Sequence, residues 1–266
     1  MADGGAITQL ARPGLARNSP VSGQVSHAGH AGPAPGQPAI AEAPPGWAIV
    51  AAALTPTLLV IAFLIGDALQ PTSYSPIRQT MSVLAGQGAT DSWVMTGALF
   101  LIGGCQLTTA VGLTTVRLPA RILLIVTGLC SIGVAASPEP ATGPGPRHLV
   151  CAALCAATTA AWPALIARRT ERRPLILSVY VCAAVTVVFA ALLCWVVIET
   201  QGGNDLGLAE RVTSSVEGVW PLVVAVLLRR AWGDSRNSTH QPLSAGPAPT
   251  QPATSPNSWV ANQSSS

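Results

Sequence analysis

The chain of 266 residues contains no lysine and few charged residues of any kind. Asp, Glu and Arg together make up 9% of the sequence, whereas about 25% is usual in soluble globular proteins. So few charges cannot cover a water-facing surface, and the mean hydropathy of +0.46 suits a surface that faces lipid. The lack of lysine excludes a Gly-rich phosphate-binding loop, which needs one. The net charge of +3 is too small and dispersed for a nucleic-acid-binding surface.

Histidine is scarce, and cysteine occurs only within apolar runs. His148 is the one histidine in the apolar part of the chain, whereas zinc-dependent membrane hydrolases need several converging histidines or carboxylates. The six cysteines are interpreted as small packing residues rather than as a disulfide framework. No nucleophile-elbow pattern is present either. We therefore expect no metal, no cofactor and no catalytic residue set.

Long apolar runs are what the sequence has in abundance. The segment 174–198 contains no charged residue and would span about 37 Å as a helix, more than the roughly 30 Å of a bilayer's hydrocarbon core. The arginine-rich turn 168–173 precedes it, as at the cytoplasmic edge of a membrane span. The sequence thus predicts an all-α fold, a bundle of six transmembrane helices at 47–66, 93–116, 122–136, 149–167, 174–198 and 212–228.

The two ends of the chain differ in composition from its middle. Residues 1–46 are rich in Gly, Pro, Ala and Ser, and residues 233–266 in Ser, Pro, Thr and Asn. Such segments cannot bury enough apolar surface to offset the entropy of ordering them, so both are predicted to be disordered tails. The transmembrane domain is expected to occupy residues 47–232, and no cleavable signal peptide is visible.

Arginines are unevenly distributed among the connections between spans. Nine of the fourteen lie in the turns 117–121 and 168–173 and in the tail after Leu228, and three alternate loops hold one each. Because arginine marks the cytoplasmic side of a membrane protein, we expect both termini in the cytoplasm. The lack of lysine and the heavy use of Ala, Gly and Pro suggest a GC-rich bacterial genome, so the expected location is the bacterial plasma membrane.

Small residues predict where helices pack closely. Gly104, Thr108 and Gly112 recur at four-residue spacing, which favours the close approach of another helix. The span 149–167 carries a ladder of alanines at the same spacing and is expected to be the most tightly packed helix. Gln106 is expected to make a hydrogen bond to a neighbouring helix.

Ionisable residues within or beside the spans gather on the predicted outer side. Two interpretations stay open: a structural ion-pair network that holds the helices in register, and a ligand-binding or catalytic pocket that opens outward. Glu217 is the best single candidate for a site, because a carboxylate at its depth needs a partner or a proton. Its expected partners are Arg78, Arg147 or His148. The candidate cluster consists of Asp67, Arg78, His148, Arg211 and Glu217.

Three motifs occur in order along the chain: YSPIRQTMSVLAGQGATDSWVMTGALFLIGG, then SPEP followed by GPGPRHL, then ERV followed by VWPL. Together they resemble a bacterial membrane family, common in actinobacteria, that is catalogued as domain of unknown function number 998. The resemblance covers roughly residues 47–232 and implies a six-span integral membrane protein, but brings no established activity, substrate or catalytic residue. The matching positions are Tyr74, Ser75, Pro76, Arg78, Ser82, His148, Arg211 and Trp220.

Three functions are compatible with these features. The first is a non-enzymatic membrane component, or a binder of a lipid or small ligand, with the lipid bilayer as its expected partner. The second is a small proton-coupled transporter in which Glu217 titrates. The third is a metal-independent hydrolase of lipid-linked substrates that uses His148 as base. The first is our working hypothesis, because no strong catalytic constellation is present.

Overall fold

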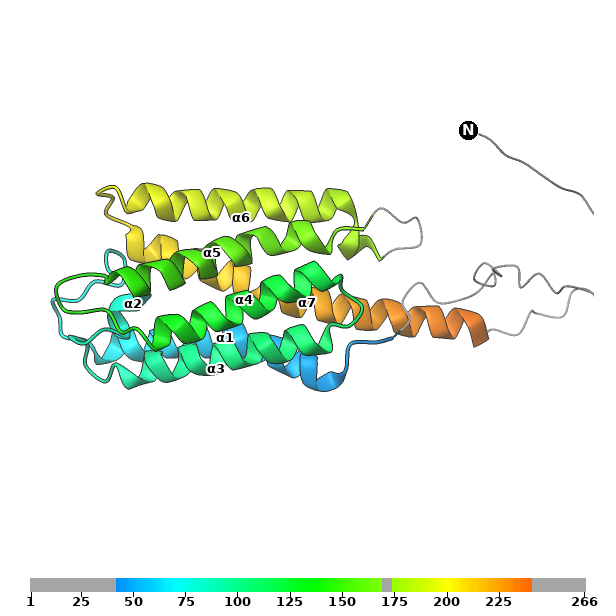
Figure 1. Cartoon of the computed structure of the whole chain (residues 1–266), viewed down its shortest axis with the longest axis horizontal. Helices are drawn as coiled ribbons and strands as arrows, with labels where there is room; N and C mark the ends of the chain where they lie inside the picture. The colour runs from blue at the N-terminus through cyan, green and yellow to red at the C-terminus, as the bar shows by residue number, and fades with distance from the viewer. Residues whose placement is uncertain (1–41, 169–173, 241–266) are drawn as a thin grey trace, which may run out of the picture. The chain divides into compact units, whose positions relative to one another are not determined.

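The structure, a computed structural model, describes residues 42–168 and 174–240, and within them the ordered elements are helices. The predicted tails fall mainly on residues 1–41 and 241–266, which lie outside the described part. The elements are α1 Gly46–Leu69, α2 Met81–Leu84, α3 Trp93–Gly112, α4 Leu118–Ala135, α5 Pro146–Ile166, the 3-10 helix Leu175–Leu177, α6 Val179–Glu199 and α7 Leu206–His240 (Figure 1).

Six of the described helices, all except the short α2 and the 3-10 helix, are long and apolar enough to cross a membrane. They coincide with the six spans expected from the sequence, so the all-α transmembrane prediction is confirmed. The largest difference is α7, which was predicted over 212–228 but has 35 residues. At 1.5 Å per residue such a helix is about 52 Å long and extends past a bilayer's hydrocarbon core.

Two other helix ends differ from the prediction for identifiable reasons. α4 begins at Leu118, earlier than expected, because Pro119 lies in its first turn, where proline is well tolerated. α6 begins at Val179, later than expected, because Ser178 caps it. The Ser178 hydroxyl accepts a hydrogen bond of 3.2 Å from the backbone N–H of Val181.

The spanning helices pack in a closed ring in the order α1, α3, α4, α5, α6 and α7, and α7 packs in turn against α1. α7 also contacts α5. We call the end of the bundle with the connections 70–92, 136–145 and 200–205 the loop end, and the opposite end, where α1 begins and α7 ends, the tail end (Figure 1).

Close helix contacts occur at one of the predicted small residues, Gly112, and at others that were not predicted. A Cβ atom on Gly103 would lie 2.6 Å from the carbonyl oxygen of Gly128, so α3 and α4 cross with their backbones in contact. Gly112 is equally tight, because a Cβ there would lie 2.3 Å from the Cβ of Ala48. Gly104, however, faces open space and Thr108 is exposed, so of the predicted four-residue stripe only Gly112 makes a close helix contact.

The alanine ladder of α5 does not make it the most tightly packed helix, as was predicted. Of the spanning stretch of α5, 22% is buried, against 39% for α1 and α4. Ala153, Ala157 and Ala164 are exposed. α6 is still less covered, with 11% buried, so these two helices form the most lipid-facing side of the bundle. A small side chain permits close packing but cannot bring a partner to it.

The buried side chains form two apolar clusters with polar groups between them. The loop-end cluster centres on Leu59, Leu84, Met95 and Ile102, and the tail-end cluster on Leu113, Leu124, Trp162, Ile166, Val224 and Leu228. Several buried polar residues lie along the helices between these clusters, namely Thr55 in α1, Thr127 in α4 and Glu217 in α7. Buried polar side chains therefore also occur in the middle of the bundle, between the two apolar clusters.

Candidate functional site

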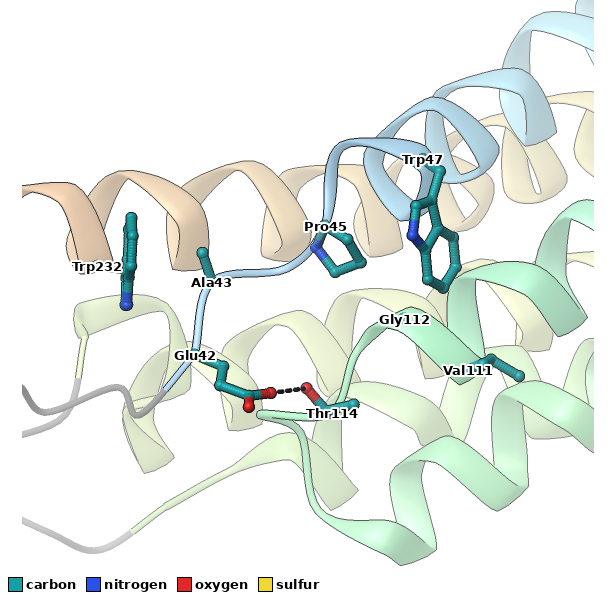
Figure 2. Close-up of a pocket in the computed structure, with 8 residues that line it drawn as sticks. All are labelled: Glu42, Ala43, Pro45, Trp47, Val111, Gly112, Thr114 and Trp232. Atoms are coloured by element: carbon teal, nitrogen blue, oxygen red, sulfur yellow. Dashed lines mark hydrogen bonds between the residues drawn. The ribbon is translucent and has the colours of Figure 1, made fainter.

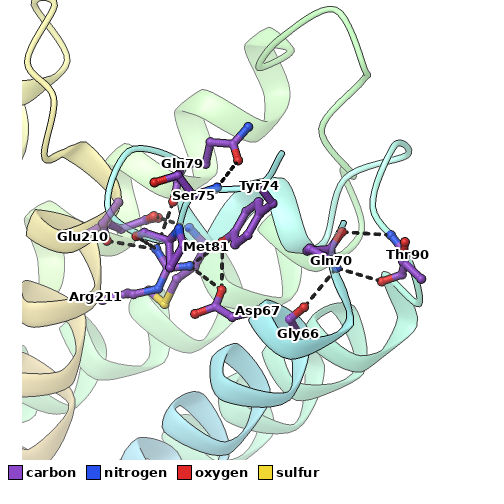
Figure 3. Close-up of polar contacts among 12 residues, drawn as sticks. Gly66, Asp67, Gln70, Tyr74, Ser75, Gln79, Met81, Thr90, Glu210 and Arg211 are labelled. Atoms are coloured by element: carbon purple, nitrogen blue, oxygen red, sulfur yellow. Dashed lines mark hydrogen bonds and ion pairs between the residues drawn. The ribbon is translucent and has the colours of Figure 1, made fainter. Parts of the chain in front are cut away.

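Arg211, in the second turn of α7, is the centre of a hydrogen-bond network at the loop end (Figure 3). Its side chain is 9% exposed. Nη1 donates to the carbonyl oxygens of Pro76 at 2.7 Å, Gln79 at 2.9 Å and Gly207 at 3.0 Å. Two of these acceptors, Pro76 and Gln79, belong to the connection between α1 and α2, which has no regular secondary structure. A buried guanidinium thus ties this connection to α7.

The acidic partner of Arg211 is Asp67 in the last turn of α1. Nη2 of Arg211 lies 2.7 Å from Oδ1 of Asp67, and the hydroxyl of Tyr74 donates to the same carboxylate oxygen at 2.8 Å. Nη2 also contacts the Tyr74 hydroxyl. Burial, and then the bond to Asp67, raise the pKa of Tyr74 above its ordinary value, which keeps the phenol protonated as a donor. We call Asp67, Tyr74 and Arg211 the clasp.

A second carboxylate reinforces this region. Glu210 precedes Arg211 in the sequence, and its Oε2 accepts a hydrogen bond of 2.5 Å from the backbone N–H of Met81, the first residue of α2 (Figure 3). Gly207, one turn earlier in α7, lies directly against the connection, because a Cβ there would lie 2.2 Å from the carbonyl oxygen of Gln79. α7, α2 and the end of α1 are thus fastened together by polar contacts.

Two members of the predicted cluster lie apart from the clasp. Arg78 is exposed and takes no part in the network. His148, at the start of α5, is buried, and its Nδ1 lies 2.8 Å from the carbonyl oxygen of Ser137. Its Nε2 has no partner. Burial raises the pKa of the nearby Glu139, and the closeness of His148 partly offsets this rise. His148 therefore holds the connection between α4 and α5 in place through Ser137, and it is not part of the clasp.

Glu217 has none of its predicted partners. The residue is 3% exposed, and its Oε1 has no hydrogen-bond partner. Arg211 forms its ion pair with Asp67 and not with Glu217, and Arg147 is exposed. The prediction of an arginine or histidine partner was therefore wrong. Glu217 is eleven residues from the start of α7, about 16 Å along the helix and near the middle of a bilayer.

Other polar atoms without partners accompany Glu217 in the middle of the bundle. Oε1 of Gln106 and Nε1 of Trp220 are buried and make no hydrogen bond. The expected interhelical bond of Gln106 is absent from the described residues, so this prediction was also wrong. Trp220 follows Glu217 by three residues and so lies on a neighbouring part of the same helix face.

The arrangement does not bring together a metal site or a hydrolase triad. Within residues 42–168 and 174–240, no group of three His, Cys, Asp or Glu residues could hold a metal ion. Asp67 is engaged by Arg211 and Tyr74, whereas His148 bonds the carbonyl of Ser137. A hydrolase that used Asp67 to orient His148 would need these two side chains to meet.

Sequence reasoning missed several residues that the structure shows to be important. Tyr74 was noted as part of a motif but not as a partner of Asp67, and Glu210 was not singled out. Gln70 was also missed, although its side chain makes two reciprocal hydrogen bonds with the backbone of Thr90, at 3.0 and 3.1 Å. The hydrogen bonds of these residues depend on the conformation of the connection 70–92, which the sequence does not specify. The motif around Tyr74 was the only signal in the sequence that pointed to this region.

Comparison with known proteins gives a family and no activity. The family model described as "Protein of unknown function (DUF998)" matches residues 50–227, more than half of the chain. The match contains all of the clasp, His148 and Glu217. No curated protein and no solved structure matches the chain. With its six membrane-spanning helices, the chain is a polytopic membrane protein that belongs to the DUF998 family.

Proposed function

We propose that this protein is a non-enzymatic, proton-binding component of the bacterial plasma membrane, and that Glu217 takes up the proton. The observation that carries the proposal is a carboxyl group 3% exposed, near mid-membrane, with an oxygen that has no partner. Ionisable groups at such depth are costly and are usually functional. A proton-coupled transporter of this size would use such a group as its titrating residue.

A proton is the ligand that this site can accept without a cavity. A buried carboxylate without a cation nearby is strongly disfavoured, and a proton removes its charge at the smallest cost in space. Spare hydrogen-bonding atoms are close along the helix, since the indole N–H of Trp220 has no acceptor. A small rotation of either side chain would let that N–H stabilise the charged form after the proton leaves.

The outer cluster supports the structural interpretation rather than a ligand pocket. Both Nη atoms of Arg211 are engaged by oxygens of the protein itself. A ligand would have to displace the Asp67 carboxylate or backbone carbonyls, which a buried and paired guanidinium resists. The clasp therefore acts as a structural fastening, and Arg78 stands outside it.

The orientation of the chain forms part of the proposal. Among the described residues, Arg117, Arg121, Arg168, Arg229 and Arg230 lie near the tail end, and the positive-inside rule places such an end in the cytoplasm. Both termini are then cytoplasmic. Reporter fusions to each terminus should both report the cytoplasm, and a fusion that reports the outside would reject this orientation.

Infrared spectroscopy tests the proton-binding role directly. The full-length protein in lipid nanodiscs should show the carbonyl stretch of a protonated carboxylic acid in a water-poor environment, and this band should disappear as the pH is raised. Glu217→Gln should abolish the band, whereas Glu210→Gln and Glu199→Gln should retain it. The proposal fails if Glu217→Gln leaves the band unchanged or if no pH-dependent acid band is found.

A further inference from the structure

The tail end of the bundle contains an open cavity of about 430 Å³. This volume lies within the range of roughly 300–1,000 Å³ that is common for small-molecule sites. The residues before α1, the end of α3 and the last part of α7 form its walls, as Figure 2 shows. The lining residues are Glu42, Ala43, Pro45, Trp47, Val111, Gly112, Thr114 and Trp232.

The chemistry of this lining suits an organic cation. Glu42 is the one charged residue among those that line the cavity. Its Oε2 lies 3.5 Å from the hydroxyl of Thr114, and it forms no ion pair with any described residue. Trp47 and Trp232 supply the aromatic part of the lining and lie at opposite ends of it (Figure 2). A carboxylate beside aromatic rings is the arrangement that recognises ammonium groups.

Trp232 already demonstrates this preference within the protein. The guanidinium carbon of Arg236 lies 4.7 Å from the centroid of the Trp232 ring. That distance is within the roughly 6 Å over which a cation is attracted to an indole ring. The cavity is therefore lined by an indole ring, that of Trp232, which accepts a cation. It is also lined by a carboxylate, that of Glu42, which forms no ion pair with a described residue.

The depth of the cavity matches lipid headgroups. Trp232 follows Leu206, the first residue of α7, by 26 residues, which is about 39 Å along the helix. The hydrocarbon core accounts for roughly 30 Å of this length. Trp47 is 51% exposed at the start of α1, in the position of an interfacial tryptophan. The cavity opens at the level where the headgroups of one leaflet lie.

Two arginines border the cavity from outside its lining. Nη1 of Arg229 lies 3.5 Å from the carbonyl oxygen of Pro44. Nε of Arg121 donates to the carbonyl oxygen of Ala110 at 2.8 Å, and its Nη2 donates to that of Val111 at 3.3 Å. Both guanidinium groups have further N–H donors. A phosphate at the rim of the cavity would meet positive charge, while an ammonium group inside it would meet Glu42.

We propose that this cavity binds the ammonium group of an aminophospholipid, with Glu42 and the ring of Trp232 as the groups that recognise the cation. The free headgroup amine, ethanolamine, shares this chemistry and is the alternative source of the ammonium group. The site is distinct from Glu217 and does not depend on proton binding there.

Native mass spectrometry of the full-length chain in detergent tests the proposal with two lipids of identical acyl chains. Phosphatidylethanolamine should bind about tenfold more tightly than phosphatidylglycerol, the difference that one charge-assisted contact of roughly 1.4 kcal/mol gives. Glu42→Gln should remove most of this preference and leave phosphatidylglycerol binding unchanged. Trp232→Ala should weaken phosphatidylethanolamine binding severalfold.

Matched variants and a competitor sharpen the result. Glu199→Gln and Trp93→Ala change the same residue types at the loop end and should leave the lipid preference intact. Displacement by free ethanolamine would identify the ammonium group alone as the ligand, and a lack of displacement would identify the intact lipid. Equal binding of the two lipids, or an unchanged preference in Glu42→Gln with a normal melting temperature, would reject the site.

Discussion

Two buried ionisable residues of α7, Arg211 and Glu217, lie six positions apart in opposite situations. Both Nη atoms of Arg211 are engaged, by one carboxylate, one hydroxyl and three backbone carbonyls. Only its Nε lacks a partner. Glu217 is also buried, but it has an oxygen without a partner and forms no ion pair with a described residue. The sequence placed both in one polar cluster. Their surroundings separate them, because a side chain engaged by its own protein stabilises the fold, whereas an unpaired one remains available for a ligand.

The largest effect is expected from Arg211→Ala, which tests whether the clasp is structural. It would leave Asp67 without its cation and the carbonyls of Pro76 and Gln79 without donors. Breaking a buried ion pair of this kind costs about 3–5 kcal/mol. The folded yield and the melting temperature in detergent should both fall sharply. Arg78→Ala removes an exposed arginine from the same connection and should have little effect. A similar fall in melting temperature in both variants would contradict a special structural role for Arg211.

The second prediction disturbs the clasp without changing any charge. Gly207→Ala places a Cβ 2.2 Å from the carbonyl oxygen of Gln79, so the connection must move away from α7. Overpacking of this kind costs about 1–3 kcal/mol. Gly104→Ala meets no atom within 4 Å and should stabilise α3 by up to about 1 kcal/mol. Thermal unfolding followed by tryptophan fluorescence should show opposite signs for the two variants.

The third prediction concerns stability at Glu217. Glu217→Gln keeps the shape of the side chain and removes its ionisation. If Glu217 formed a structural ion pair, this change would lower the free energy of unfolding by several kcal/mol. Because Glu217 has no such pair, we expect the melting temperature to stay the same or to rise. A fall in melting temperature comparable to that of Arg211→Ala would show that Glu217 has a structural partner. Both residues would then have a structural role.

The smallest effect is a pH dependence at the loop end, outside the membrane. Burial raises the pKa of Glu139 above its ordinary value of 4.5, so the folded protein binds this proton more tightly than the unfolded chain does. The stabilisation is complete below pH 4.5 and is lost as the pH rises through the pKa of the folded state. Glu139→Gln should flatten this part of the stability curve, whereas the exposed Glu42→Gln should not.

The helices and the candidate residues Asp67, Arg211 and Glu217 could be predicted from the sequence, but the partners of these residues could not. The six spans follow from apolar runs long enough to cross a bilayer, a signal that needs no tertiary contact. The packing predictions that used spacing alone were right at Gly112 but wrong at Gly104 and for the alanine ladder of α5. Gly103 and Gly104 are adjacent glycines, yet only Gly103 lies against the backbone of another helix, at Gly128. Which side of α3 faces α4 depends on the rotation of both helices, and the weakly amphipathic spans do not specify that rotation.

The sequence by itself determined the class of the molecule: its scarcity of charge and its long apolar runs admit only a helical membrane bundle. The tertiary structure decided what each polar residue does. It joined Asp67 to Arg211 across 144 positions, left Glu217 without an ion-pair partner among the described residues, and placed Glu42, from a segment expected to be unstructured, in the lining of a cavity. Composition acts through transfer between water and lipid and sums along the chain, whereas a hydrogen bond requires two particular atoms to lie within about 3 Å, and only the folded chain sets that distance.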